Sequence, residues 1–124
     1  MDISAETDNR RQIFRVSLAA AGIPIQINDL ATCHLLDAHS EGFGATVPRE
    51  GRSLRVGKVV QVRLAYGDQV WCGRATVRVI MRRENGTFRC GFAVLPNEQT
   101  LRRGLRQVAI AVQRQRLTRV ANRR

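Results

Sequence analysis

Lysine, aromatic residues and long apolar runs are all scarce in this chain of 124 residues. Lys58 is the only lysine, and aromatic residues make up 5% of the sequence. No apolar run approaches the roughly 20 residues that a membrane-spanning helix needs, so we expect no membrane span. The few aromatics argue against a platform that stacks single-stranded nucleic acid. They also predict a core built mainly from aliphatic side chains.

The sequence has no closely spaced cysteine pair. Cys33, Cys72 and Cys90 are odd in number and far apart. The acidic N-terminus shows no apolar signal-peptide segment, so we expect free thiols in a reducing cytoplasm. Cys33-His34 and His39 suggest a metal only faintly, because adjacent residues of a strand point to opposite faces. No metal site and no cofactor are predicted.

Acidic residues are outnumbered, 10 to 21, by basic ones, which leaves a net charge of +11. Such an excess points to an anionic partner. The excess is concentrated at the C-terminal end, where residues 97–124 carry eight arginines against one acid. A basic helix there could bind nucleic acid with an affinity that falls steeply with salt. A nucleic-acid partner is nevertheless unlikely, because the middle of the chain is closer to charge balance.

Apolar alternation divides the chain into a leader, a β-rich body and a helix. Residues 1–12 show no periodicity and predict a flexible arm. Residues 13–96 form the β-rich body, 97–120 a helix and 121–124 a short tail. Six short strands with short turns indicate an all-β antiparallel barrel or sandwich. We expect these strands from residue 14 (resuming after Gly22 to residue 27) and at 30–36, 45–47, 59–64, 70–81 and 88–95.

Turn signals separate the predicted strands. We expect a glycine-containing bend over residues 37–44 and a charged surface loop over residues 49–57. Asn85-Gly86 predicts a hairpin with a type I′ turn. Within the 70–81 run, alternation places Val77, Val79 and Met81 on one side of the strand. Trp71 belongs either to the barrel surface or to the core.

The C-terminal segment changes from a period of two to a helical period. Asn97 is the expected N-cap. Four apolar residues then recur on one face of the helix, and we expect this stripe to cover an open end or seam of the β-body. The basic face of the helix is expected to be solvated. The stripe consists of Leu101, Leu105, Val108 and Val112.

Three arginines, Arg10, Arg11 and Arg15, lie within six residues at the point where the leader meets the first strand. A guanidinium group can hold phosphate through two parallel hydrogen bonds, stack on a ring, or donate to the O6 and N7 atoms of guanine. Such a triplet can also be plain solvated surface. Its interpretation therefore depends on the rest of the chain.

The second motif is Asp37-Ala38-His39-Ser40-Glu41-Gly42, near the end of the second predicted strand. An Arg-x-x-x-Arg arm followed by Asp/Asn-x-Ser-x-x-Gly resembles the PilZ domain family over residues 9–117. The resemblance implies a six-stranded antiparallel β-barrel with a C-terminal α-helix. It also implies a receptor for the bacterial second messenger cyclic di-GMP (c-di-GMP).

The resemblance assigns site residues one by one. Arg11 and Arg15 take the two arginine positions of the arm, preceded by the extra arginine at position 10. Asp37 takes the acidic position and Gly42 the glycine. His39 stands where the family has serine, and sliding the motif by one residue would place Ser40 there, at the cost of both the acid and the glycine.

Each assigned residue has a chemical role that suits the nucleotide. The arginines can hold a phosphate or a guanine edge, and the Asp37 carboxylate can accept hydrogen bonds from guanine N–H groups. Gly42 lets the backbone approach without a Cβ in the way. His39 could donate to phosphate, or its ring could fill the pocket. The alternative is a purely structural role, in which Asp37 and Gly42 form a turn and bind no ligand.

The sequence thus favours a cytoplasmic, non-catalytic c-di-GMP receptor that passes its signal to an unidentified effector protein. No nucleophile and base stand at a spacing typical of an enzyme. The alternative is a PilZ-like adaptor whose nucleotide binding is weak or lost because of His39. We expect a monomer or a homodimer.

Overall fold

The structure, a computed structural model, describes residues 16–39 and 41–122. Within these ranges the side chains of residues 31, 32 and 119–122 are not described. Four predicted site residues, Arg10, Arg11, Arg15 and Ser40, therefore lie outside the described part of the chain. Asp37, His39 and Gly42 lie inside it.

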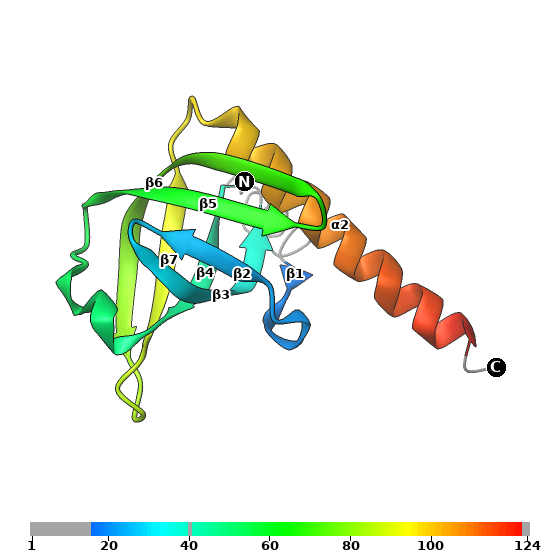
Figure 1. Ribbon diagram of the computed structural model, residues 1–124, viewed down its shortest axis with the longest axis horizontal. Coiled ribbons are helices and arrows are strands. Elements are labelled where there is room, and N and C mark those ends of the chain that lie inside the picture. The colour runs from blue at the N-terminus through cyan, green and yellow to red at the C-terminus, as the bar shows by residue number, and fades with distance from the viewer. Residues whose placement is uncertain (1–15, 40, 123–124) are drawn as a thin grey trace, which may run out of the picture.

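The body of the protein is a closed antiparallel β-barrel (Figure 1). The strands run in the order β1-β3-β2-β5-β6-β7-β4, and β3 also pairs with β4, which closes six strands into a barrel and leaves β1 as an addition at its edge. This confirms the expected all-β fold with a C-terminal helix. The strands are β1 (Val16–Ser17), β2 (Pro24–Ile27), β3 (Leu30–His39), β4 (Gly42–Val47), β5 (Val59–Tyr66), β6 (Gln69–Arg82) and β7 (Phe88–Val94).

Two short 3₁₀ helices interrupt segments expected to be strand or loop. The first, η1 (Ala19–Ala21), breaks the extended run that alternation predicts from residue 14. It ends at Gly22, whose left-handed φ of 62° is accessible to glycine without steric cost. The second, η2 (Arg49–Ser53), lies in the predicted surface loop.

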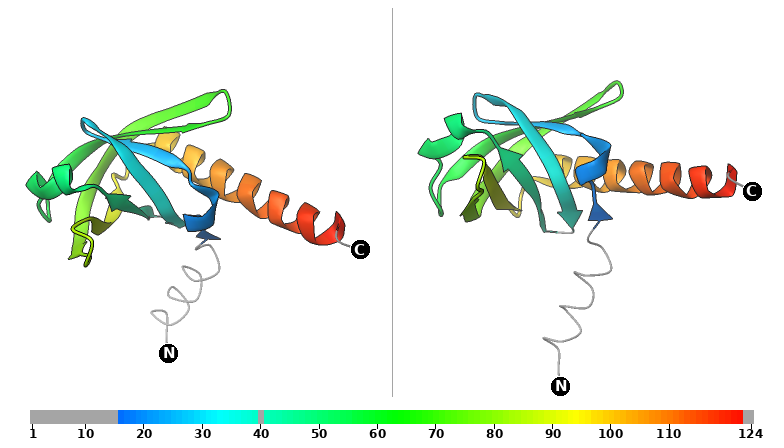
Figure 2. Two further views of the ribbon diagram at one scale, coloured as in Figure 1. Left: turned by 60° about the horizontal axis from the view of Figure 1, so that its bottom comes forward. Right: turned by 90° about the horizontal axis from the view of Figure 1, so that it is seen from below.

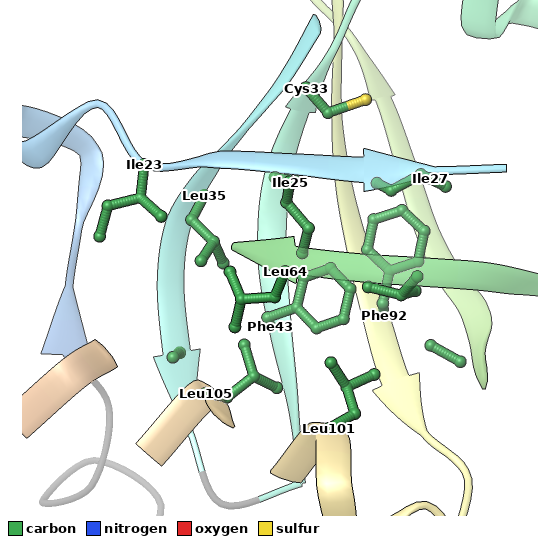
Figure 3. Close-up of a cluster of buried hydrophobic side chains, with 14 of the residues drawn as sticks. Ile23, Ile25, Ile27, Cys33, Leu35, Phe43, Leu64, Phe92, Leu101 and Leu105 are labelled. Carbon is green, nitrogen blue, oxygen red and sulfur yellow. The ribbon is translucent and has the colours of Figure 1, made fainter. Parts of the chain in front are cut away.

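The barrel interior is filled by inward-facing residues that alternate along the strands and by apolar residues of the helix. Phe43 and Phe92 stack at its centre, with ring centroids 4.8 Å apart. Leu101 and Leu105 project into the same cluster from the helix (Figure 3). The expected aliphatic core is thus built around one aromatic pair.

Helix α2 (Gln99–Asn122) lies along one end of the barrel and continues past it (Figure 2). Its predicted apolar stripe is buried. Two glycines allow the helix to approach β6 closely. A Cβ on Gly73 would lie 2.8 Å from the Cβ of Leu101, and a Cβ on Gly104 would overlap the ring of Trp71. Trp71 is therefore a core residue beneath the helix, 8% exposed.

Glu98, rather than Asn97, caps the helix. Its carbonyl oxygen accepts from the Arg102 backbone N–H at 3.3 Å, which is the bond that defines the cap position. Its carboxylate reaches β6, where Oε2 accepts from the Arg74 backbone N–H (2.7 Å) and Oε1 accepts from Arg74 Nη2 (3.2 Å). The prediction of Asn97 was wrong by one residue, because the helix begins at Gln99 and the residue before it, Glu98, is bonded to the barrel.

The expected bend over residues 37–44 is instead mostly strand. Asp37, Ala38 and His39 belong to β3, and β4 begins at Gly42, so that His39 pairs with Gly42. Pairing with two neighbours extends β3, because β1 joins it on one side and β4 on the other. Loop composition alone could not show these partners.

The β6–β7 hairpin also differs from its prediction. An irregularity in register between Val77 and Val79 turns the next residues over, so that Val79 and Met81 are exposed while Ile80 faces inward. The hairpin at Asn85-Gly86 is present, but Gly86 has a φ of 83° and Asn85 does not adopt a positive φ. The turn is therefore not type I′, which needs positive φ at both residues.

In the described ranges, the structure has no helix long and apolar enough to cross a membrane.

We expect Gly104→Ala to destabilise the protein although alanine is the better helix former. Alanine gains about 1 kcal/mol of helix propensity, whereas overpacking against Trp71 costs about 1–3 kcal/mol. Urea unfolding followed by circular dichroism should show a lower free energy of unfolding. Gln107→Ala, at an exposed position of the same helix, is the control and should change stability little. If Gly104→Ala were as stable as that control, the close approach of helix and barrel would not constrain the fold.

Candidate functional site

An open hollow of about 770 Å³ lies between α2 and the adjoining ends of β1 and β3. Val16 of β1 and Ala38 and His39 of β3 line its barrel side. The opposite wall is the face of α2 from Gln99 to Gln113. The volume falls within the roughly 300–1,000 Å³ of ordinary small-molecule sites.

Strand pairing positions the barrel side of the hollow. Val16 pairs with Ala38 across the β1–β3 ladder, and Ser17 pairs with Asp37. The next residue, Leu18, is buried and its backbone N–H donates to the Leu36 carbonyl at 2.7 Å. The point where the N-terminal segment enters the barrel is therefore held against the second sequence motif.

Three arginines of α2 line the other wall: Arg102, Arg103 and Arg106. Arg102 is partly buried, and its Nη2 donates to the Val94 carbonyl at 3.0 Å, which ties it to the end of β7. Arg103 and Arg106 are exposed. The sequence pattern predicts a solvated basic face for this helix, and no sequence motif marks these arginines as site residues.

A sequence signal for the helix wall does exist. Arg102, Arg106, Ala109 and Gln113 each follow one member of the buried apolar stripe by a single residue. One residue turns a helix by about 100°, so this row flanks the buried face. It must border whatever end of the barrel the apolar stripe covers.

Asp37 is buried, at 8% exposure, and is not among the described residues that line the hollow. Its side chain lies against Gly44 of the neighbouring strand, where an added Cβ would come within 2.8 Å of Asp37 Oδ1. The absence of a side chain at Gly44 therefore provides the space for the carboxylate. The structure brings His39 to the hollow and leaves Asp37 beside it in the strand pair.

Gly42 has a packing role of its own. A Cβ at this position would overlap the carbonyl oxygen of Phe92 on β7, the strand beside it. Because that oxygen belongs to the backbone, the overlap could be relieved only by moving a strand of the barrel. The fold thus requires glycine here whether or not a ligand approaches, and contact with a ligand stays a prediction.

The cysteines give the site no reactive group. Burial raises the pKa of the Cys33 thiol to about 11, with a smaller contribution from nearby Cys90, and burial raises the pKa of Cys90 to about 11 as well. Both thiols therefore stay protonated and poorly nucleophilic at neutral pH. Cys72 is exposed on β6. Across the described residues, no three His, Cys, Asp or Glu side chains cluster as metal ligands would.

The barrel with its C-terminal helix is similar to several solved structures. The PilZ domain of YcgR from Escherichia coli with c-di-GMP superposes with a TM-score of 0.68 and 21% identity, covering 87% of this chain and 95% of that one. The chain has a PilZ-like fold. This confirms the fold that the sequence resemblance implies.

Two further PilZ-like matches are to longer chains. The complex of E. coli YcgR with c-di-GMP matches with a TM-score of 0.65 and 22% identity over 90% of this chain. Bacillus subtilis MotI/DgrA, an inhibitor of motility, matches with a TM-score of 0.63 and 15% identity over 81% of this chain. This chain spans 49% of each of those chains. The sequence matches no protein-family model and no curated protein.

We expect Gly42→Ala to lower the free energy of unfolding by about 1–3 kcal/mol or more, because overpacking here must displace backbone. Fluorescence of Trp71, the only tryptophan, can follow urea unfolding. Gly91→Ala is the matched control. Its Cβ would lie 3.6 Å from the Cβ of Val79, an ordinary contact, and should leave stability nearly unchanged. Equal stabilities of the two variants would show that the β4–β7 approach tolerates a side chain.

Proposed function

We propose that this protein is a non-catalytic, cytoplasmic receptor for c-di-GMP. The observation that supports the proposal is that the residue following the arginine motif and part of the second motif line one hollow. Val16, which directly follows Arg15 in the chain, lines the hollow together with Ala38 and His39 of the second motif. Two segments more than twenty residues apart in sequence therefore adjoin one cavity of suitable size.

The chemistry of the predicted residues supports the choice of ligand. Arg11 and Arg15 would hold the phosphates or the guanine edge, with Arg10 as a further cation. His39, half-buried at the hollow, would face the same ligand. Asp37 would accept from guanine N–H groups, Ser40 would add a hydroxyl, and Gly42 would permit close approach of the backbone. The c-di-GMP present in two of the similar structures supports the assignment.

The signal would pass to a protein partner through a change in the N-terminal arm. In the proposed mechanism, ligand binding orders the arginine segment over the hollow, which alters the surface presented to an effector. The similarity to an inhibitor of motility supports an effector that is itself a protein. The protein would act as a monomer or a homodimer.

One observation favours a second candidate, an adaptor with weak or lost nucleotide binding. The imidazole of His39 lies at the wall of the hollow, where the motif has the smaller hydroxyl of serine. A ring at this position can occupy space that the ligand needs. Such an adaptor would act through contacts with another protein alone.

Titration calorimetry with c-di-GMP should show binding by the wild-type protein. Loss of a bidentate, charge-assisted contact costs about 1.5–3 kcal/mol, so Arg11→Ala and Arg15→Ala should each weaken binding about tenfold to a hundredfold. Arg83→Ala, which removes an exposed arginine from the β6–β7 hairpin, is the control for net charge and should bind like the wild type. No heat of binding at high micromolar ligand would reject the receptor.

His39→Ser separates the receptor from the adaptor. If the wild type is a working receptor, the substitution should change affinity by less than about tenfold, because the arginines supply most of the binding energy. The same calorimetric titration measures it, with circular dichroism to check the fold. Strong binding gained only by the serine variant would favour the adaptor.

A further inference from the structure

We infer that Arg103 and Arg106 of α2 form a phosphate-binding subsite on the helix wall of the hollow. The inference rests on the proposed function for the identity of the ligand. The subsite itself rests on the structure of the helix wall. Sequence resemblance assigned the site only to the arm and the β3–β4 corner.

The first support is the charge of the cavity. Three arginines line the hollow, and the described residues that line it include no aspartate or glutamate. Arg103 and Arg106, at helical positions i and i+3, carry like charges that repel each other. A hollow bounded by apolar side chains concentrates this field. An anion bound there would relieve the repulsion.

The second support is that the three arginines differ in their contacts with the barrel. Arg102 donates to the Val94 carbonyl and is thereby anchored to the barrel. Arg103 and Arg106 are exposed and border the same hollow. They can turn their guanidinium groups toward a bound phosphate without breaking a contact that holds the helix in place. Arg102 is therefore a positioning residue, and the other two are the proposed ligands.

The third support is the rigidity of the wall. Gly104 and Leu105 lie between Arg103 and Arg106 in the sequence and pack on the barrel. This packing fixes the helix segment that carries the two arginines. A binding group on a rigid element loses less conformational freedom on binding than the same group on a loop. The backbone that carries the subsite is thus preformed.

The test compares Arg106→Ala and Arg103→Ala with Arg114→Ala by c-di-GMP calorimetry. Arg114 is exposed on the same helix and is not among the residues that line the hollow, so it controls for net charge and helix composition. We expect each subsite variant to weaken binding about tenfold or more, and Arg114→Ala to weaken it less than threefold, in line with the loss of a charged hydrogen bond. Unchanged affinity in both subsite variants, with a binding wild type, would overturn the subsite and leave the proposed function standing.

A second measurement tests the subsite independently of c-di-GMP. Inorganic pyrophosphate is titrated into ¹⁵N-labelled protein, and amide shifts are followed by NMR. We expect saturable shifts at residues 102–106 in the wild type and in Arg114→Ala, and their loss in Arg106→Ala. If c-di-GMP fails to bind while these shifts appear, the subsite stands and the proposed ligand is wrong. If pyrophosphate causes no saturable shift at these residues, the subsite is rejected.

Discussion

The close seating of α2 on the barrel is the constraint on which the rest of the structure depends. The helix and β6 approach at Gly73 and Gly104, where an added Cβ would meet Leu101 or Trp71. Glu98 fixes the start of the helix by accepting two hydrogen bonds from Arg74. Leu101 and Leu105 then enter the cluster around Phe43 and Phe92 (Figure 3). Dispersion contacts weaken steeply with distance. This packing therefore depends on glycine at positions 73 and 104, where a side chain would hold the helix away from the barrel.

The same helix supplies both the lid of the core and a wall of the hollow. The apolar stripe and the flanking row of Arg102, Arg106, Ala109 and Gln113 are offset by one residue, so a rotation of the helix that improved the packing of one would displace the other. The position of Arg102, Arg103 and Arg106 relative to β3 is therefore set by core packing. A change deep in the barrel end, far from any ligand, would alter the geometry of the site.

Alternation and helical spacing predict most of the strands and the helix, because both patterns reflect burial directly. The predictions are wrong where the structure depends on which segments pair. The residues after Leu36 look like a turn by composition, yet they continue β3 because β1 and β4 pair with them. The outward turn of Val79 and Met81 depends on a local irregularity in register. At the site, motif spacing pointed to the β3–β4 corner, but no motif marks the arginines of α2, whose placement follows from which end of the barrel the helix covers.

A hydrogen bond between described residues links β1 to the distal half of α2. Arg116 Nη2, on the distal half of α2, donates to the carbonyl of Ser17 in β1 at 2.7 Å. In the described part of the chain, β1 is two residues long and pairs with β3 alone. A shift of β1 away from β3 must either break the bond to Arg116 or pull on the far end of the helix. This hydrogen bond thus couples the position of β1 to the position of the projecting half of α2.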